Sequence, residues 1–324
     1  MSATTDTTNG IAREADRERE PAQRRRTLGF TVYLAALLND KLTLLAVVFL
    51  VALGFAAVFA PLAAPFDPMA QNLLLRNKPP MTPAAAPDAL PHLLGTDPLG
   101  RDLLSRIVFG ARISLSVGAL SVIISGVVGT VAGLVAGYRR GGVDDLVMRV
   151  VDIQMGFPSL LLALLVLYAL GASIWNVIIV LAVTRWTIYA RMARGIVLAQ
   201  RESAFVEAAQ AIGCSDRRIL FIHILPNMLA PLLVLATLET AALILSEASL
   251  SFLGLGIQPP DTSWGLMLAE GRQYLRVAWW IVLFPGLALL FTALSLNLLA
   301  TWLRGVTDPV QRWRYLTRAS KTLG

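Results

Sequence analysis

The sequence predicts an all-α integral membrane protein with six spanning helices. Of its 324 residues, 56% are hydrophobic and only 15% are charged, whereas soluble domains carry about 25% charged residues. Six apolar stretches each reach about 20 residues, the length that a helix needs to cross the hydrocarbon core. Backbone polar groups inside a bilayer must be satisfied within the segment, so stretches of this length are expected to be helical.

The six predicted spans cover residues 42–62, 113–137, 146–170, 174–192, 228–248 and 279–303. Only Gly171-Ala172-Ser173 separates the third span from the fourth, so we expect these two helices to form an antiparallel hairpin. The first apolar run lies about forty residues into the chain, too far for the leader of a secretory signal, and is therefore interpreted as an uncleaved spanning helix.

The distribution of basic residues predicts the orientation. With the N-terminus inside, 21 of the 28 lysines and arginines fall on the inner side, which favours an N-in, C-in topology. The polar residues 1–27 are expected to form a disordered cytoplasmic tail. The remaining chain divides into a first span with an extracytoplasmic segment (28–112), a core transmembrane domain (113–315) with a cytoplasmic loop at 193–226, and a cytoplasmic tail (316–324).

Several function classes are excluded. The net charge is +7, but the basic residues lie between apolar runs and form no single patch, so no nucleic-acid partner is expected. The single cysteine, Cys214, rules out an intrachain disulfide and a cysteine-clustered metal site. His92 and His223 are far apart in sequence, so no metal site is predicted. No Gly-x-x-x-x-Gly-Lys-Ser/Thr motif follows a strand, so this chain has no predicted ATP site.

The loop between the fourth and fifth spans carries a distinct pattern. Four apolar residues at i, i+3, i+4 and i+7 predict one face of a short helix, namely Phe205, Ala208, Ala209 and Ile212. Gly213 is a natural helix stop, Ser215 can cap a second short helix, and Pro226 is expected to end the loop. The alternative is an ordinary amphipathic loop on the membrane surface.

The same loop resembles the signature of binding-protein-dependent ABC importer permeases, which have the type I importer fold. The matching residues are Glu207-Ala208-Ala209, Gly213 and His223-Ile224-Leu225-Pro226. Histidine at 223, where most branches have isoleucine, is similar to the dipeptide/oligopeptide/nickel branch. Gly95 to Asp102 and Leu250 to Gly256 are similar to two segments of the second permease subunit in peptide systems. The resemblance covers about residues 30–315.

In this family the loop helix sits in a cleft of an ATPase subunit, so the resemblance implies an ATPase-coupling loop. Its residues here are Glu207, Ala208, Ala209, Gly213, His223, Leu225 and Pro226. Small side chains at 208 and 209 would permit close packing against the ATPase. Glu207 would offer a charge to donors there, and Gly213 would permit the tight turn.

The resemblance also implies the surroundings of the chain. It would form half of a pore in the bacterial inner membrane and carry di- or oligopeptides by alternating access. Its partners would be a second homologous permease, two ATP-binding subunits and an extracytoplasmic solute-binding protein. ATP and Mg would be bound by the partner subunits, and this chain would bind no cofactor and catalyse no reaction. Nickel, glutathione-like or other small solutes are alternative cargoes.

Charged residues outside the loop suggest further roles. Glu239, in the middle of the fifth span, is a candidate pore-lining residue, because ionisable groups inside membranes are usually functional. An interhelix hydrogen bond or a contact with the partner permease is the alternative. Asp97, Arg101 and Asp102 form an outer cluster, interpreted either as a docking site for the solute-binding protein or as a salt-bridged cap on the second span.

Two features predict close packing. Glycines recur every three or four residues in the second span, at Gly126, Gly129, Gly133 and Gly137, and such spacing lets helix backbones approach closely. The outer segment 249–278 is apolar for a solvent loop and is expected to fold back into the mouth of the pore.

Two rival classes remain. An ion-coupled secondary transporter would need paired repeats with discontinuous spans and a carboxylate relay, and the sequence has neither a clear repeat nor more than a lone Glu239 for the relay. A structural or scaffold membrane protein would have no associated ATPase.

Overall fold

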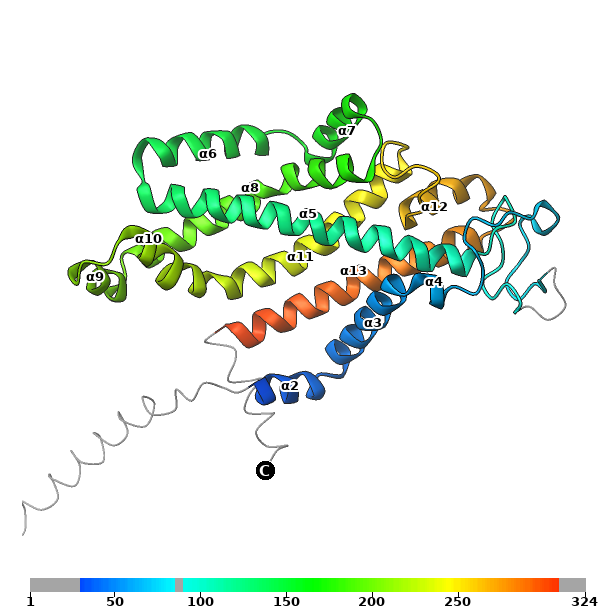
Figure 1. The fold of residues 1–324 in the computed structure, drawn as a ribbon, viewed down its shortest axis with the longest axis horizontal. Helices are drawn as coiled ribbons and strands as arrows, with labels where there is room; N and C mark the ends of the chain where they lie inside the picture. Colours follow the sequence, from blue (N-terminus) through cyan, green and yellow to red (C-terminus); the bar gives the residue numbers. More distant parts are fainter. Residues whose placement is uncertain (1–29, 85–89, 309–324) are drawn as a thin grey trace, which may run out of the picture.

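The computed structural model describes residues 30–84 and 90–308, and over these ranges it is helical, with only two isolated β-bridges. The predicted tails at 1–27 and 316–324 lie outside the described residues. The α-helices, labelled as in Figure 1, are α2 (Phe30–Asn39), α3 (Lys41–Val58), α4 (Ala60–Ala63), α5 (Leu103–Arg139), α6 (Gly141–Met155), α7 (Ser159–Leu170), α8 (Ile174–Arg201), α9 (Ala204–Ala211), α10 (Asp216–Arg218), α11 (Leu225–Phe252), α12 (Trp264–Gly271) and α13 (Trp280–Thr307). Short 3-10 helices cover η1 (Leu73–Leu75) and η3 (Arg272–Tyr274), and a π-helix covers η2 (Ile219–Ile224).

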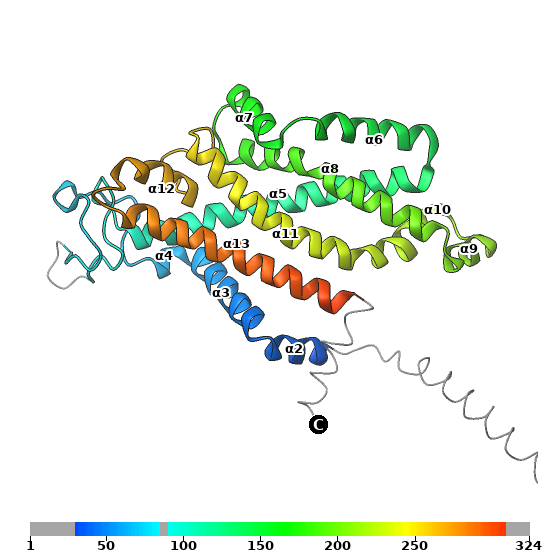
Figure 2. The same ribbon diagram turned by 180° about the vertical axis from the view of Figure 1, so that it is seen from behind.

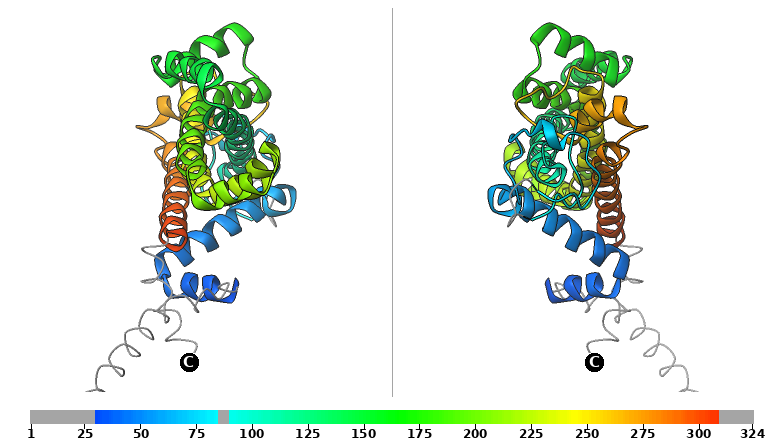
Figure 3. Two further views of the ribbon diagram at one scale, coloured as in Figure 1. Left: turned by 90° about the vertical axis from the view of Figure 1, so that its left-hand side faces the viewer. Right: turned by 90° about the vertical axis from the view of Figure 1, so that its right-hand side faces the viewer.

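The long helices run side by side in an elongated bundle and alternate in direction along the chain (Figure 1). One end carries α9 and α10, and the other carries α4, α12 and the irregular chain before α5 (Figure 2). In the views along the bundle, α6 and α7 lie on one side of α5, and α2 and α3 lie on the opposite side (Figure 3). The excess of basic residues assigns the α9 end to the cytoplasm.

The predicted all-α membrane fold is confirmed. Within the described residues, four helices are long and apolar enough to cross a membrane: α3, α5, the continuous helical stretch Asp216–Phe252, and α13. A fifth crossing results if α6 and α7 count as one span. The remaining predicted span corresponds to α8, which is 28 residues long and packs along α5. Its arginines, including Arg185 and Arg191, make it more polar than the other spans.

The third predicted span, 146–170, is not one continuous helix. Helix α6 ends at Met155, α7 begins at Ser159, and the two axes differ by 88°. Pro158 explains the break, because proline disfavours helical backbone in the residue before it and cannot donate a hydrogen bond to the preceding turn. We call this bend, residues 156–158, the elbow.

One boundary and one additional helix differ from expectation. Helix α5 starts at Leu103, well before residue 113, so the predicted domain boundary at 112 falls inside it. The early start follows from Asp102, whose side chain accepts the Ser105 amide at 2.8 Å and caps the helix. Helix α2 was not predicted. Its Ala36 is buried with Trp302 at the inner end of α13.

The closest helix contact joins α5 to α8. A Cβ atom placed on Gly129 would lie 2.2 Å from the carbonyl oxygen of Trp186, and one on Gly133 would lie 2.3 Å from that of Ala190. Only glycine leaves room for the two backbones at these positions, so the predicted close packing is confirmed there. Gly137 is also crowded, at 2.9 Å from Val197, whereas a Cβ atom on Gly126 would make an ordinary contact at 3.5 Å.

The outer segment 249–278 folds back onto the bundle, and its place in the mouth of the pore stays a prediction. Trp264, the first residue of α12, is fully buried, and its indole nitrogen donates to the Ile107 carbonyl of α5 at 3.0 Å. Gly265 lies against the backbone of Ala248 in α11, with no room for a Cβ atom. Helix α12 therefore closes the outer end of this chain's own helices.

We expect Gly133→Leu to disrupt the α5–α8 contact, because its side chain would collide with backbone that cannot move aside. Overpacking of this kind costs at least about 1–3 kcal/mol. The melting temperature and monodisperse yield of the purified protein should both fall. The matched control is Gly54→Leu in α3, where no atom lies within 4 Å of the added Cβ. Equal behaviour of the two variants would contradict the proposed constraint.

Candidate functional site

The inner loop is shorter than the predicted range 193–226. Helix α8 continues to Arg201, and the eight-residue α9 follows after two residues. Two hydrogen bonds end α9, from the Cys214 amide to the Ala209 carbonyl at 3.0 Å and from the Gly213 amide to the Gln210 carbonyl at 2.9 Å. They form a Schellman turn, with Gly213 at φ +79°. The predicted stop at Gly213 is confirmed.

Pro226 does not end the loop, contrary to expectation. Helical structure is continuous from Asp216 to Phe252, through α10, η2 and α11. Pro226 sits in the first turn of α11, where a missing amide hydrogen is tolerated. Ser215 occupies the position before α10 as predicted, but its side chain makes no capping hydrogen bond.

The loop is fixed to the bundle by buried contacts. Val206 is fully buried and Ala209 is 6% exposed, and both belong to a core with Val197 of α8 and Ile219 of η2. Polar contacts join the loop to the end of α5. The Tyr138 hydroxyl donates to Asp216 at 2.7 Å, and Arg201 donates to the Tyr138 carbonyl at 2.6 Å. Helix α9 is therefore held against the bundle instead of hanging from it.

The exposed face of α9 differs from the predicted face. Phe205 is 43% exposed and Ile212 is 81% exposed, and Glu207 and Ala208 are also exposed. Ala209, predicted to face the ATPase, instead faces the chain's own core. The four-residue apolar pattern is split because the protein uses the Val206–Ala209 stripe to anchor the helix.

The other predicted coupling residues lie behind α9, where the loop enters α11. His223 and Leu225 are half-buried, and Pro226 is exposed. The His223 carbonyl accepts a hydrogen bond from the Asn227 side chain at 2.8 Å. These three residues therefore shape the start of the long inner helix.

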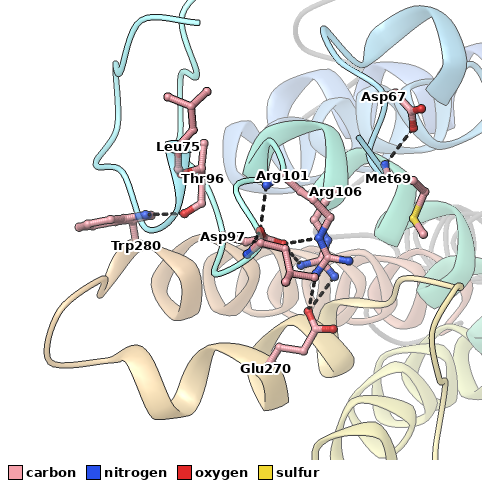
Figure 4. A network of polar contacts seen from close by, with 10 residues as sticks. Asp67, Met69, Leu75, Thr96, Asp97, Arg101, Arg106, Glu270 and Trp280 are labelled. Atoms are coloured by element: carbon pink, nitrogen blue, oxygen red, sulfur yellow. Dashed lines mark hydrogen bonds and ion pairs between the residues drawn. The ribbon is translucent and has the colours of Figure 1, made fainter. Parts of the chain in front are cut away.

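At the outer end, a buried charge network surrounds Asp97 (Figure 4). One Asp97 oxygen accepts the amides of Leu99 and Arg101 at 2.8 and 2.9 Å. The other accepts the Arg101 Nε at 2.6 Å and an Arg106 nitrogen at 2.7 Å. Glu270 of α12 then accepts from Arg106 at 2.8 Å and from Arg101 at 3.3 Å. We call these four charged residues the outer cap.

The predicted docking residues are all inside this region. Asp97 is 0% exposed, Arg101 6% and Asp102 2%. Asp102 caps α5 and also lies 2.8 Å from the Nδ1 atom of His92. Of the two interpretations of these residues, the contacts agree with a salt-bridged cap on the second span. Arg106 and Glu270, which complete the network, were missed from the sequence, although Arg106 lies one helical turn after Asp102.

A second buried carboxylate joins the outer ends of α5 and α11. Glu247 is 0% exposed and accepts hydrogen bonds from Ser251 at 2.7 Å and from Ser114 at 3.2 Å. The Ser114 oxygen in turn accepts the Trp264 amide at 3.3 Å. Glu247 therefore helps to seat α12.

Glu239 of α11 faces α8 near the middle of the bundle. It is 9% exposed, and the nearest cation is Arg185 at 3.5 Å, which is too long for a good hydrogen bond. The facing Glu239 oxygen has no hydrogen-bond partner among the described residues. The structure therefore pairs Glu239 with α8, and a role in lining the pore stays a prediction.

No cluster of three or more histidine, cysteine or acidic side chains suited to a metal ion occurs in residues 30–84 and 90–308. The polar groups described above form the ion pairs of the outer cap, the contacts that hold the inner loop, and one long ion pair between Arg185 and Glu239.

We expect Arg106→Gln to destabilise the outer cap, because Asp97 and Glu270 would each lose a buried cationic partner. Breaking a buried pair costs about 3–5 kcal/mol. Thermal unfolding of the purified protein and protease cleavage within residues 64–102 would measure the effect. The control is Arg140→Gln, whose pair with Glu202 is exposed and contributes at most about 1 kcal/mol. A cap that resists protease equally in both variants would refute this expectation.

Comparisons with known proteins agree with the geometry. Residues 129–312 match the family described as "Binding-protein-dependent transport system inner membrane component", and residues 33–80 match "N-terminal TM domain of oligopeptide transport permease C". The chain is 41% identical over 271 residues to the di/tripeptide transport system permease protein DppC of Pseudomonas aeruginosa (strain UCBPP-PA14), covering 84% of this chain and 89% of that protein.

Two further relatives and one solved structure are similar. A putative peptide transport system permease protein of Brucella suis is 45% identical over 81% of this chain and 86% of its own. The glutathione transport system permease protein GsiD of Escherichia coli O6:K15:H31 is 42% identical over 84% and 87%. A chain of the inward-facing MetNI methionine ABC transporter shares the fold, with a TM-score of 0.50 and 19% identity over 65% of this chain and 97% of that one. The chain therefore belongs to the family of binding-protein-dependent transport system inner membrane components, as a multi-pass protein of the bacterial inner membrane.

Proposed function

We propose that this chain forms one half of the translocation pore of an ATP-binding-cassette importer for di- and oligopeptides. Its relatives carry the names of peptide permeases, which supports the cargo class. The similarity to a glutathione permease supports the alternative of a glutathione-like solute. The chain itself binds no nucleotide in this proposal, and the energy comes from partner subunits.

The observation that carries the proposal is the mounting of α9. This helix lies at the inner end of the bundle with Glu207, Ala208 and Ile212 exposed, while Val206 and Ala209 anchor it. A partner that moves α9 would also move the continuous helix Asp216–Phe252, because both share one buried core. Such a mount suits a helix that transmits motion from an ATPase to the spans.

The proposed assembly contains a second homologous permease, two ATP-binding subunits and an extracytoplasmic solute-binding protein. Closure of the ATPases on ATP would draw the α9 helices together and open the pore outward, and hydrolysis would reset it inward. On the outer side, the predicted docking residues Asp97, Arg101 and Asp102 would act through the loops that they hold. Exposed side chains in those loops, such as Leu73 and Leu74, are available for contact.

The proposal is tested by purifying the chain in mild detergent from its native membrane and identifying the proteins that accompany it. We expect an ATPase, a second permease and ATP-dependent peptide uptake after reconstitution. Purification of the chain without any accompanying ATPase would contradict the proposal. Uptake that survives ATP depletion but stops with an uncoupler would instead favour an ion-coupled transporter.

We expect Glu207→Lys to uncouple ATP hydrolysis from uptake without blocking membrane insertion. A lost charged hydrogen bond is worth about 1.5–3 kcal/mol, which corresponds to roughly tenfold or more in affinity for the ATPase. Uptake and ATPase activity measured in proteoliposomes would reveal the effect. The matched control is Glu202→Lys, an exposed acid that precedes α9 and pairs with Arg140. Normal uptake in the Glu207 variant would argue against a coupling role.

Gly213→Asp should give the same uncoupled phenotype for a different reason. Gly213 has φ +79°, a left-handed backbone conformation that residues other than glycine rarely adopt. No atom lies within 4 Å of an added Cβ atom, so the strain would come from the backbone and not from crowding. The turn would be strained and α9 displaced. Gly195→Asp in α8 is the control, because that site is equally open and has ordinary helical backbone. Unchanged uptake in the Gly213 variant would show that the turn geometry is dispensable.

A further inference from the structure

The elbow between α6 and α7 borders a cavity against α8 that is lined by both apolar and polar side chains. The cavity has a volume of about 190 Å³, and its polar lining consists of Gln154, Ser159, Thr184, Arg185 and Thr187. Helices α6 and α7 are the only pair of bent helices among the described residues that together could form a span. A break of this kind inside a membrane is tolerated where it is buried in protein or lines a cavity.

Arg185 lies at this cavity with unused binding capacity. Its only ion-pair partner within the described residues is Glu239 at 3.5 Å, and no hydrogen bond of its guanidinium occurs there. Two other arginines of the same helix are bound far more tightly. Arg194 lies 2.5 Å from Asp144, and Arg191 lies 2.7 Å from Asp152. Among these three arginines of α8, Arg185 is therefore the one without a short acceptor contact, and its guanidinium can take one.

The cavity also faces the start of α7. No side chain caps this 12-residue helix, whose N-cap position is Pro158, and Ser159 at its first turn lines the cavity. Unpaired amides and the helix dipole give such an end a partial positive charge. The cavity thus combines a guanidinium with a positive helix end. Of the nearby carboxylates, Glu239 faces Arg185 and Asp152 is paired with Arg191. An incoming anion fits this arrangement.

The pair lies near the middle of its two helices. Glu239 is near the centre of the 28-residue α11, about 20 Å from either end at 1.5 Å per residue. Unpaired charges at this depth are costly. A lone carboxylate that took Arg185 would leave Glu239 unpaired, whereas a zwitterion would supply an ammonium to Glu239 at the same time. The exchange keeps every charge paired.

We propose that Arg185 and the elbow cavity bind the terminal carboxylate of a short peptide in transit, while Glu239 receives its terminal ammonium. The inference rests on the proposed function and adds the chemistry by which the pore accepts its cargo. A dipeptide spans at most about 7 Å, so both of its ends can reach a single ion pair that has opened. In the absence of cargo, Arg185 and Glu239 neutralise each other.

The test uses the complete transporter in proteoliposomes, with its own ATPases and binding protein and radiolabelled Ala-Ala as the probe. We expect Arg185→Gln to reduce initial uptake at least tenfold, while ATPase stimulation by the loaded binding protein stays within twofold of wild type. Arg191→Gln is the matched control, because Arg191 lies on the same helix in an exposed pair. Equal uptake by the two variants would overturn the proposed site.

A second variant separates binding from mere structure. Combining Arg185→Glu with Glu239→Arg keeps an ion pair between α8 and α11 but moves the cation away from the cavity. We expect this complex to assemble and still fail to transport Ala-Ala. Recovery of uptake would show that the elbow cavity does not select the carboxylate end of the peptide, and would overturn the inference. If the wild-type complex shows no ATP-dependent uptake of Ala-Ala, the peptide assignment fails first and this site fails with it.

Discussion

The close approach of α5 and α8 is the contact on which the rest of the molecule depends. At Gly129 and Gly133 the two backbones leave no space for a Cβ atom, so the helices meet in one register. Helix α8 then presents Arg185 to the elbow cavity and continues at its inner end into α9. Helix α5 reaches from the outer cap to Tyr138, beside the inner loop. The α5–α8 contact at these glycines therefore sets the relative positions of the outer cap and the inner loop, which lie at opposite ends of the bundle.

Rigid and deformable parts are distributed unequally around this contact. The outer cap and Glu247 fix α12 to α5 and α11 through buried, directed bonds. At the inner end, Asp216 and Val206 fix the loop to α5 and α8. The α6–α7 bend contrasts with both, because it borders a cavity and one side chain, Gln154, ties it to α8, donating to the Val183 carbonyl at 2.5 Å and accepting from the Trp186 indole at 2.8 Å. A transporter that alternates between two shapes needs such a region beside its rigid frame.

The sequence predicted the features that depend on local pattern. Apolar length located α3, α5, α11 and α13, and a single glycine located the end of α9. It did not predict the elbow, because an apolar run looks the same on both sides of Pro158. The sequence also did not predict which face of α9 would be buried against the rest of the chain. The choice of Val206 and Ala209 depends on residues such as Ile219 that only the folded loop brings near. The Arg106–Glu270 and Arg185–Glu239 pairs join helices far apart in sequence and leave no periodic trace.

The outer cap has a consequence for how the protein is made. Arg106 and Glu270 are 164 residues apart, and two pairs of crossings are synthesised between them. During translation, the first third of the chain must therefore wait at the outer surface with its arginines satisfied only by Asp97 and water. Export of α12 delivers the missing carboxylate, and only then can the outer end close. The outer cap can therefore form completely only after the last hairpin has been made, and a chain that ends before α12 lacks one of the two carboxylates that hold Arg106.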